Sequence, residues 1–213
     1  MEHTLCRNEV ELSGTVADCP TLSHENHGLR FYRFTLEVPR LSGQTDLLPI
    51  LILESACSAA AQGSPLHLRG QFRSFNNKSG QGSRLILTVL AQELLPDDGT
   101  LCNRILLSGA LCKPPTLRRT PLGRSICDLM LAVPRKYGRA DYLPVIAWGQ
   151  LAAAASRRSV GSRLDLDGRI QSRIYHKLTE RGPEEHTAYE VSVMHLLDES
   201  PAEPTQAASG ALV

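Results

Sequence analysis

Aromatic side chains are scarce in this chain of 213 residues, which contains one Trp, five Tyr and four Phe. Long apolar runs are also missing: no stretch approaches the roughly 20 residues that a membrane-spanning helix needs, so we expect no membrane association. The opening residues lack the charged-then-apolar order of a secretory signal. A hydrophobic content of 42% is ordinary for a globular protein, and we interpret the cysteines as thiols of a cytoplasmic protein.

The six cysteines are scattered at positions 6, 19, 57, 102, 112 and 127, and no C-x-x-C pair occurs. Their spacing therefore supports neither a disulfide framework nor a zinc site. Catalytic motifs are missing as well, since the chain has no Gly-rich phosphate loop, no G-x-S-x-G and no H-E-x-x-H. We predict reduced thiols, no metal, no cofactor and no catalytic residue, and we expect that the protein is not an enzyme.

The near-zero net charge conceals a division along the chain. Residues 1–102 carry 8 Lys/Arg and 11 Asp/Glu, for a net charge of −3, whereas residues 103–175 carry 13 and 4, for +9. Residues 176–213 carry 2 and 7, for −5. A block of +9 inside a neutral protein favours a polyanionic partner for that block. A solvated basic surface is the alternative that charge alone leaves open.

The chain contains an internal repeat. Five landmarks of the first half recur at a constant offset of 95 residues: Asn8 at Asn103, Gly14 at Gly109, Val38-Pro-Arg40 at Val133-Pro-Arg135, Asp46 at Asp141 and Pro49 at Pro144. The offset grows to 98 between Gly70 and Gly168, where loops would absorb the difference. A single offset across five landmarks indicates a duplicated unit of about 90 residues.

Each copy carries five strand signals in the same order. The predicted strands lie near 8–17, 29–39, 47–54, 65–75 and 83–95, and again near 103–112, 124–134, 142–148, 163–175 and 187–197. Helix-prone segments follow the third strand of each copy, at 55–62 and 150–158. Five short strands with a helix after the third have the order of an OB-fold, a small Greek-key barrel. We therefore predict an all-β protein of two tandem five-stranded OB-fold barrels.

The predicted domains are residues 1–95 for the first barrel and 103–197 for the second. Residues 96–102 form a short, turn-rich linker between them. Residues 198–213 show no periodicity, and we expect them to form a disordered tail.

The second copy resembles the bacterial single-stranded DNA-binding protein family. The similar segments follow the family's order over nearly all of this copy: Asn103 to Gly109, Lys113 to Gly123, Leu129 to Arg135, Val145 to Gly149 and Gly161 to Tyr175. The resemblance implies sequence-independent binding of single-stranded DNA in replication, recombination or repair. It also implies a location in the cytoplasm, associated with the nucleoid.

The resemblance further implies four rings that stack on bases, at Tyr137, Tyr142, Trp148 and Tyr175. Alternation along the strands directs the last three outward. The alternative interpretation is that these rings pack against the protein itself and do not contact bases. Stacking contributes roughly 1–3 kcal/mol per base and tolerates any sequence, so one continuous row of rings would suit unpaired nucleotides. Cations beside the rings would neutralise phosphates and make binding salt-sensitive; they are Arg118, Arg119, Arg124, Arg135, Lys136, Arg169 and Arg173.

The first copy lacks most of these rings, since Ser42, Leu47 and Leu53 occupy three of the matching positions. The outward positions of its third strand are apolar, and we predict that Leu47, Leu51 and Leu53 form an assembly interface. Phe75 is its one candidate stacking residue. A minor role in DNA binding is left open for four arginines, Arg30, Arg33, Arg40 and Arg73.

The family typically assembles four barrels, so two copies of this chain predict a homodimer. Its members also typically end in an acidic tail with a terminal aromatic residue that recruits replication and repair proteins, whereas this sequence ends in Ala-Leu-Val. The standard docking motif for such partners is therefore not seen. The alternative function is an accessory OB-fold scaffold of a primosome or of a plasmid or conjugative-transfer system. RNA or tRNA binding is a third interpretation, because stacking alone does not distinguish RNA from DNA.

Overall fold

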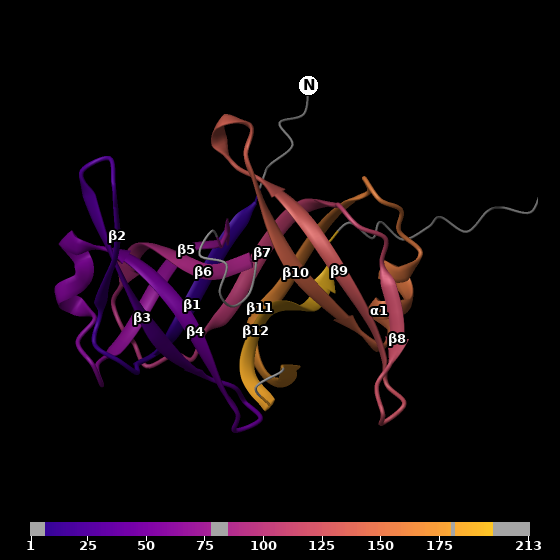
Figure 1. Cartoon of the computed structure of the whole chain (residues 1–213), viewed down its shortest axis with the longest axis horizontal. Coiled ribbons are helices and arrows are strands. Elements are labelled where there is room, and N and C mark those ends of the chain that lie inside the picture. Colours follow the sequence, from indigo (N-terminus) through magenta and orange to yellow (C-terminus); the bar gives the residue numbers. More distant parts are fainter. Residues whose placement is uncertain (1–6, 78–84, 180–181, 198–213) are drawn as a thin grey trace, which may run out of the picture.

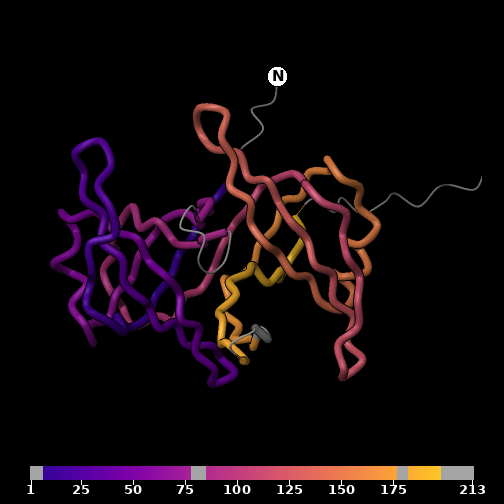
Figure 2. Tube along the Cα trace, viewed as in Figure 1, coloured from indigo at the N-terminus to yellow at the C-terminus, as the bar shows by residue number. Residues whose placement is uncertain are grey.

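A computed structural model describes residues 7–77, 85–179 and 182–197 of the chain. Its strands form two closed barrels that stand side by side (Figure 1). The chain completes the first barrel before it enters the second, as the progression of colour along the trace shows (Figure 2). Within the described residues, no helix combines the length and apolar character needed to cross a membrane.

The first barrel contains five long strands: β1 (Asn8–Val16), β3 (Leu29–Pro39), β4 (Thr45–Leu53), β5 (Pro65–Asn76) and β6 (Leu85–Leu95). They are ordered β1-β3-β4-β6-β5 and return to β1, which closes the barrel. The β4–β6 pair is parallel and the others are antiparallel. A 3₁₀ helix, η1 (Glu54–Ala59), follows β4.

The second barrel repeats this order with five further strands: β7 (Asn103–Leu111), β9 (Ser125–Pro134), β10 (Ala140–Trp148), β11 (Arg163–Thr179) and β12 (Gly182–Leu196). The helix α1 (Gly149–Ser156) follows β10 and packs Ala152 and Ala155 into the core. A short 3₁₀ turn, η2 (Lys136–Gly138), connects β9 to β10. The predicted fold class, two tandem OB-fold barrels with a helix after the third strand, is confirmed.

Two short strands were not predicted from the sequence. β2 (Thr21–Asn26) pairs with β3, and β8 (Thr116–Arg119) pairs with β9, so that they form the two outer edges of the sheet. All residues of both strands are exposed. A strand with neither face buried lacks the apolar alternation by which sequence patterns reveal strands.

The repeated glycines Gly70 and Gly168 each lie at a register shift in their barrel, on β5 and β11. A Cβ atom on Gly70 would lie 2.1 Å from the carbonyl oxygen of Leu90, and one on Gly168 would lie 2.6 Å from that of Ser192. Any side chain there would force the paired strands apart. The two barrels therefore share a close backbone approach that requires glycine.

Strands β1 and β7 join the barrels as an antiparallel pair. Val10 pairs with Ile105, which is its own counterpart at the offset of 95 residues. Leu12 pairs with Asn103, and the counterparts of these two residues, Leu107 and Asn8, also pair. The two barrels are thus related by a local two-fold axis that passes through the Val10–Ile105 pair.

A buried carboxylate joins the first barrel to the second at one side of this axis. Asp46 on β4 has no exposed surface. It accepts hydrogen bonds from Arg40 Nε at 2.6 Å and from the main-chain N–H of Ser172 on β11 at 2.7 Å. The Leu47 N–H donates to Ser172 Oγ at 3.0 Å. This set of contacts is termed the Asp46 clamp.

The same contacts recur at the other side of the axis with the barrels exchanged. The fully buried Asp141 on β10 accepts from Arg135 Nε at 2.6 Å and from the Ser74 N–H on β5 at 2.6 Å. The Tyr142 N–H donates to Ser74 Oγ at 2.7 Å. Arg73 is a second arginine that donates to Asp141, at 3.1 Å. This Asp141 clamp and the Asp46 clamp fix the barrels against each other.

We predict that the Asp141→Ala substitution lowers the free energy of unfolding by about 3–5 kcal/mol, because it leaves two largely buried arginines without a counter-charge. Urea unfolding of the whole chain measures this loss. The control is Asp128→Ala, which removes a partner of Arg118 at a half-exposed surface and should cost at most about 1 kcal/mol. Equal losses in the two variants would contradict the structural role of the clamp.

Candidate nucleic-acid interface

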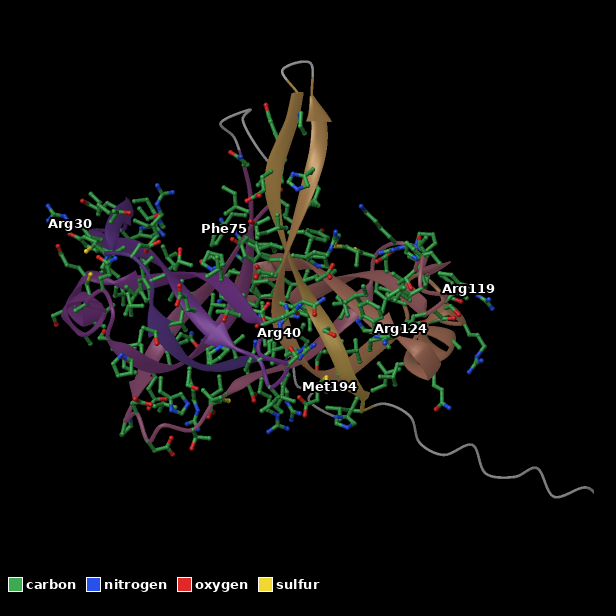
Figure 3. The ribbon with its side chains drawn as sticks, turned by 90° about the horizontal axis from the view of Figure 1, so that it is seen from below. Arg30, Arg40, Phe75, Arg119, Arg124 and Met194 are labelled. Carbon is green, nitrogen blue, oxygen red and sulfur yellow. The ribbon has the colours of Figure 1, made fainter. Side chains whose placement is uncertain are left out.

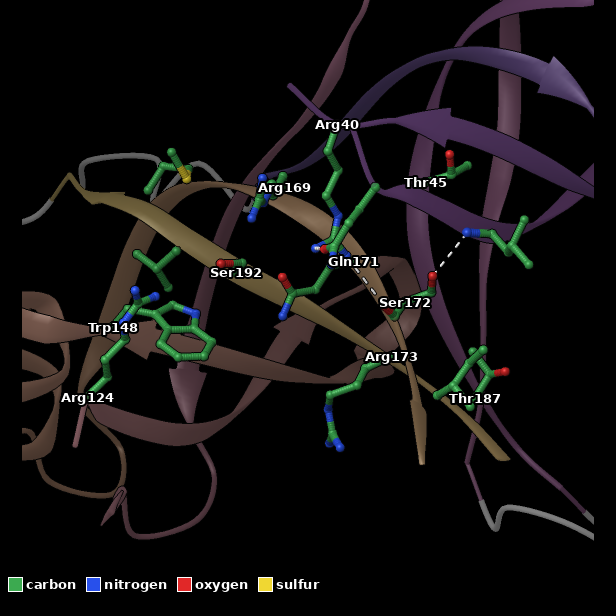
Figure 4. A pocket seen from close by; sticks show the side chains of 15 residues that line it. Arg40, Thr45, Arg124, Trp148, Arg169, Gln171, Ser172, Arg173, Thr187 and Ser192 are labelled. Carbon is green, nitrogen blue, oxygen red and sulfur yellow. Dashed lines mark hydrogen bonds between the residues drawn. The ribbon is translucent and has the colours of Figure 1, made fainter. Parts of the chain in front are cut away.

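A groove of about 890 Å³ lies at the junction of the barrels, beside the Asp46 clamp. One side is the ribbon formed by β11 and β12, and Trp148 stands with Arg124 at one end (Figure 4). Residues of the first barrel's β3–β4 hairpin line it as well. Four arginines and no carboxylate belong to its described lining, namely Arg40, Arg124, Arg169 and Arg173. The feature is termed the Trp148 groove.

Trp148 is the last residue of β10, and 38% of its surface is exposed. Leu143, Val145 and Ala147 are buried in the second barrel, so strand alternation turns the indole outward. The next residue, Gly149, has a φ of +58°, a conformation that glycine adopts readily, and there the chain leaves β10 for α1. The predicted outward position of Trp148 is therefore present in the structure.

The arginines of the ribbon differ in their partners. Arg173 lies with its guanidinium carbon 5.7 Å from the centroid of the Tyr175 ring, and its Nε is 3.9 Å from a Glu190 oxygen. Arg169 has a buried Nε that finds no hydrogen-bond partner among the described residues. Arg124 is exposed, and no ion pair is found for it in the described part of the chain. These groups retain donors that an anionic ligand can use.

Tyr175 lies further along β11, next to the groove. Its ring stacks on that of His186 from β12, with centroids 5.6 Å apart and an interplanar angle of 26°. The ring remains 37% exposed. One face of Tyr175 is thus supported by the ribbon itself, which limits the orientations that the ring can adopt.

The other predicted rings, Tyr137, Tyr142 and Phe75, do not line the Trp148 groove. Tyr142 belongs to the Asp141 clamp through its main-chain N–H. Tyr137 is 97% exposed on the β9–β10 hairpin, which projects away from the β3–β4 hairpin (Figure 1). Seen from below, Phe75 lies on the first barrel, well apart from Arg124 (Figure 3). Of the predicted rings, Trp148 alone lines the groove, Tyr175 follows the lining residues Arg173 and Ile174 on β11, and the other three lie on different parts of the surface.

The local two-fold axis accounts for this division. Tyr142 is the counterpart of Leu47 at the offset of 95, and Phe75 is the counterpart of Arg173 at the offset of 98. Because Leu47 and Arg173 line the Trp148 groove, their counterparts lie at the equivalent place on the Asp141 side. All of the predicted rings are exposed, but the two-fold axis places Tyr142 and Phe75 on the Asp141 side of the junction.

The prediction that Arg135 binds phosphate does not fit its position. Its side chain is only 18% exposed and holds Asp141 and the Ser74 carbonyl oxygen, the latter at 2.8 Å. The guanidinium also lies 5.3 Å from the centroid of the Phe75 ring. Arg135 therefore stabilises the junction. In the sequence Arg135 cannot be distinguished from an exposed arginine, because its carboxylate partner is revealed only by the fold.

The remaining predicted cations lie on the surface of the second barrel. Arg118 donates to Asp128 at 3.1 Å, and this hydrogen bond raises the pKa of Arg118, which stays charged. Arg119 and Lys136 are not buried, and among the described residues neither forms an ion pair. They lie outside the Trp148 groove, on β8 and on the β9–β10 hairpin.

The predicted assembly interface of the first barrel is only partly accessible. Leu47 is exposed but lines the groove, with its N–H bonded to Ser172 of the same chain. Leu51 is 7% exposed and belongs to the buried residues, so its predicted contact with another chain is wrong. Leu53 is half-buried. The apolar outward face of β4 thus serves in part to join the two barrels.

One cluster of potential metal ligands occurs in the described part of the chain, formed by Glu11, His67 and Cys102, whose ligand atoms lie within 4.8 Å of one another. Arg69 Nε donates to Glu11 Oε2 at 2.9 Å and lowers the pKa of the carboxyl. His67 Nε2 contacts Glu11 Oε1 at 3.2 Å. Both oxygens therefore have protein partners. Sequence spacing could not reveal this cluster, because its members come from three distant segments.

Sequence reasoning missed several groove residues, among them Thr45, Gln171 and Met194. None of these residue types signals ligand binding by itself. Their proximity arises from the junction, which brings β4 of one barrel beside β11 of the other.

Residues 102–197 match the Single-strand binding protein family. A single-stranded DNA-binding protein of Clostridium tetani is 39% identical over 80 residues, which cover 34% of this chain and 55% of that protein. Single-stranded DNA-binding protein 2 of Listeria innocua is 38% identical over 82 residues, which cover 35% of this chain and 52% of that protein. The chain spans about half the length of the curated relatives it matches.

A crystal structure of the wild-type single-stranded DNA binding protein from Thermus aquaticus is similar across both barrels. Its TM-score is 0.70 at 24% identity, with 94% of this chain and 96% of that chain covered. At this identity the likeness shows a shared fold. The second barrel thus matches the single-strand binding protein family, and the two barrels together share the fold of the Thermus aquaticus protein.

Proposed function

We propose that this chain binds single-stranded DNA without sequence preference and protects it during replication, recombination or repair. The observation that carries the proposal is the Trp148 groove, which is lined by an exposed indole and four arginines and by no carboxylate among the described residues. The matched relatives, which are named single-stranded DNA-binding proteins, support the same ligand. The proposed action is binding alone, with no reaction catalysed.

The chemistry of the groove favours an unpaired strand over a duplex. A base stacks on Trp148 only if its face is free, which requires that it be unpaired or flipped out of a helix. Arg124, Arg169 and Arg173 would meet the phosphates, which carry the same charge at every position and make binding independent of sequence. Affinity then depends on the number of stacked rings and neutralised phosphates.

The proposed stacking residues are divided between the Trp148 groove and the surface on the Asp141 side. Trp148 and Tyr175 would stack bases at the groove, whereas Tyr137, Tyr142 and Phe75 would offer a separate contact on the Asp141 side. The proposed phosphate ligands are Arg118, Arg119, Arg124, Lys136, Arg169 and Arg173. We also propose residues 1–95 and 103–197 as the two domains, with 96–102 as the linker. The predicted tail, 198–213, lies outside the described residues.

A homodimer with four barrels is proposed as the assembled form. The resemblance to a family that typically combines four barrels supports it. The first barrel also exposes apolar side chains away from the Trp148 groove, including Leu22 and Leu29 on the β2–β3 hairpin. Such a patch of aliphatic surface is characteristic of protein contacts.

Titration with oligo-dT, with RNA of equal length and with duplex DNA tests the proposed ligand. We expect oligo-dT to quench Trp148 fluorescence, because a stacked base contacts the chain's one indole. The affinity should fall linearly on a log–log plot against salt, with a slope of about −0.7 for each phosphate neutralised. Equal affinity for duplex DNA would refute the proposal, and tighter binding of RNA would reassign the ligand.

We predict that Trp148→Ala weakens the binding of a labelled oligo-dT by about 1–3 kcal/mol, the contribution of one stacked base. Fluorescence anisotropy of the label measures the affinity without the indole. The control is Val160→Ala, which shortens an exposed apolar side chain of the same barrel outside the groove and should leave the affinity unchanged. Unaltered binding by the Trp148 variant would show that the site lies elsewhere.

Light scattering on a sizing column tests the proposed assembly. We expect a mass of twice the 23.3 kDa of one chain, because the exposed apolar surface of the first barrel would be covered by a second copy. A species of 23.3 kDa across the concentration range would contradict the homodimer and leave two barrels as the binding unit.

A further inference from the structure

Three neighbouring strands at the junction of the barrels each bring one potential metal ligand to the same place. Glu11 lies on β1, His67 lies on β5 at one side of it, and Cys102 directly precedes β7 at the other side. Ser13 of β1 pairs with His67 and exchanges hydrogen bonds with the main chain of Cys102. The register of the strands therefore brings the ligand atoms of the three side chains within 4.8 Å of one another.

The ring of His67 is buried without a complete set of hydrogen bonds. Only 8% of this residue is exposed. Its Nε2 lies 3.2 Å from Glu11 Oε1, whereas its Nδ1 is buried and has no hydrogen-bond partner among the described residues. Because buried polar groups are normally paired, hydrogen bonding within the described part of the chain does not account for the burial of this ring. An ion coordinated by the ring would account for it.

The spacing of the ligand atoms suits a small tetrahedral ion. Nitrogen and oxygen ligands at about 2.0–2.2 Å from a tetrahedral zinc ion lie roughly 3.4 Å apart, close to the 3.2 Å between His67 Nε2 and Glu11 Oε1. Arg69 Nε holds the other carboxylate oxygen at 2.9 Å, which leaves Oε1 directed at the ring. The Cys102 thiol makes a long hydrogen bond of 3.5 Å to the Glu11 main-chain oxygen, which coordination of an ion would replace.

We propose that Glu11, His67 and Cys102 bind one Zn²⁺ ion, with a water molecule as the fourth ligand. One imidazole, one thiolate and one carboxylate are the kinds of ligand that zinc takes in proteins. The thiolate and the carboxylate together balance the charge of the ion, and the proton of the thiol is released to solvent. Because the ligands come from β1, β5 and the residue before β7, the ion would join the first barrel to the start of the second.

The proposed zinc site is separate from the surface proposed to bind DNA. None of its three ligands lines the Trp148 groove. The second barrel has no equivalent site, because Leu106 and Asp165 occupy the positions that correspond to Glu11 and His67 at offsets of 95 and 98. Glu11 lines another groove, of about 490 Å³, through which an ion can enter. The inference replaces the expectation of no metal, which rested on the spacing of residues along the sequence.

Titration of the reduced full chain with Co²⁺, followed by Zn²⁺, tests the site in the absence of DNA. Because Co²⁺ bound to a thiolate absorbs by charge transfer, we expect a near-ultraviolet band that saturates at one ion per chain and disappears when Zn²⁺ displaces Co²⁺. Cys102→Ser should abolish this band. Glu11→Gln, which preserves the size of the side chain, should weaken Zn²⁺ binding at least about tenfold in competition with a chromophoric chelator.

The matched control is Cys112→Ser. Cys112 is also a half-buried thiol that donates to a main-chain oxygen, that of Met130 at 3.3 Å, but it does not belong to the cluster. This variant should keep both the band and the affinity. Should Cys102→Ser fail to fold by circular dichroism, Glu11→Gln decides the question by itself.

Two results would overturn the inference: no charge-transfer band in the unaltered chain, or the same band and affinity in Cys102→Ser and Cys112→Ser. Either result would leave the proposed function intact, because the titration contains no DNA and the ligands lie outside the Trp148 groove.

Discussion

The structure depends on two buried carboxylates that each join one barrel to the other. Asp46 and Asp141 accept the main-chain N–H of a serine across the junction while an arginine of their own barrel neutralises them. A buried charge without such partners would be strongly destabilising. The contacts therefore hold only when both barrels are correctly placed. With the β1–β7 pair between them, they turn a tandem repeat into one symmetric unit.

This junction also determines which arginines pair with buried carboxylates and which remain at the surface. In the first barrel, Arg40 and Arg73 bind the carboxylates of the clamps. In the second barrel only Arg135 does so, which leaves Arg124, Arg169 and other cations directed at the surface. Of the cations that give residues 103–175 their excess of +9, Arg124, Arg169 and Arg173 thus lie in the groove with the exposed indole. The duplication has produced two barrels of one fold, which contribute unequal numbers of arginines to the two buried carboxylates.

Much of this arrangement could be predicted from the sequence, because strand alternation and the constant repeat offset report local geometry. The outward position of Trp148 and the fold itself followed from them. The errors concern contacts between the barrels. Arg135 and Leu51 have the pattern of exposed residues, but the junction places the first on Asp141 and the fold buries the second. Likewise, Tyr142 and Phe75 lie apart from Trp148 because a two-fold axis, invisible in a linear pattern, relates the copies.

Hydrogen–deuterium exchange of the full chain, with and without oligo-dT, is the sharpest test of whether a single strand binds in the Trp148 groove, which residues of both barrels line. We expect slower exchange on binding in two separate segments together, the β3–β4 hairpin at residues 40–47 and the ribbon at residues 169–175. Slower exchange in the ribbon alone, or at strands remote from the junction, would contradict it.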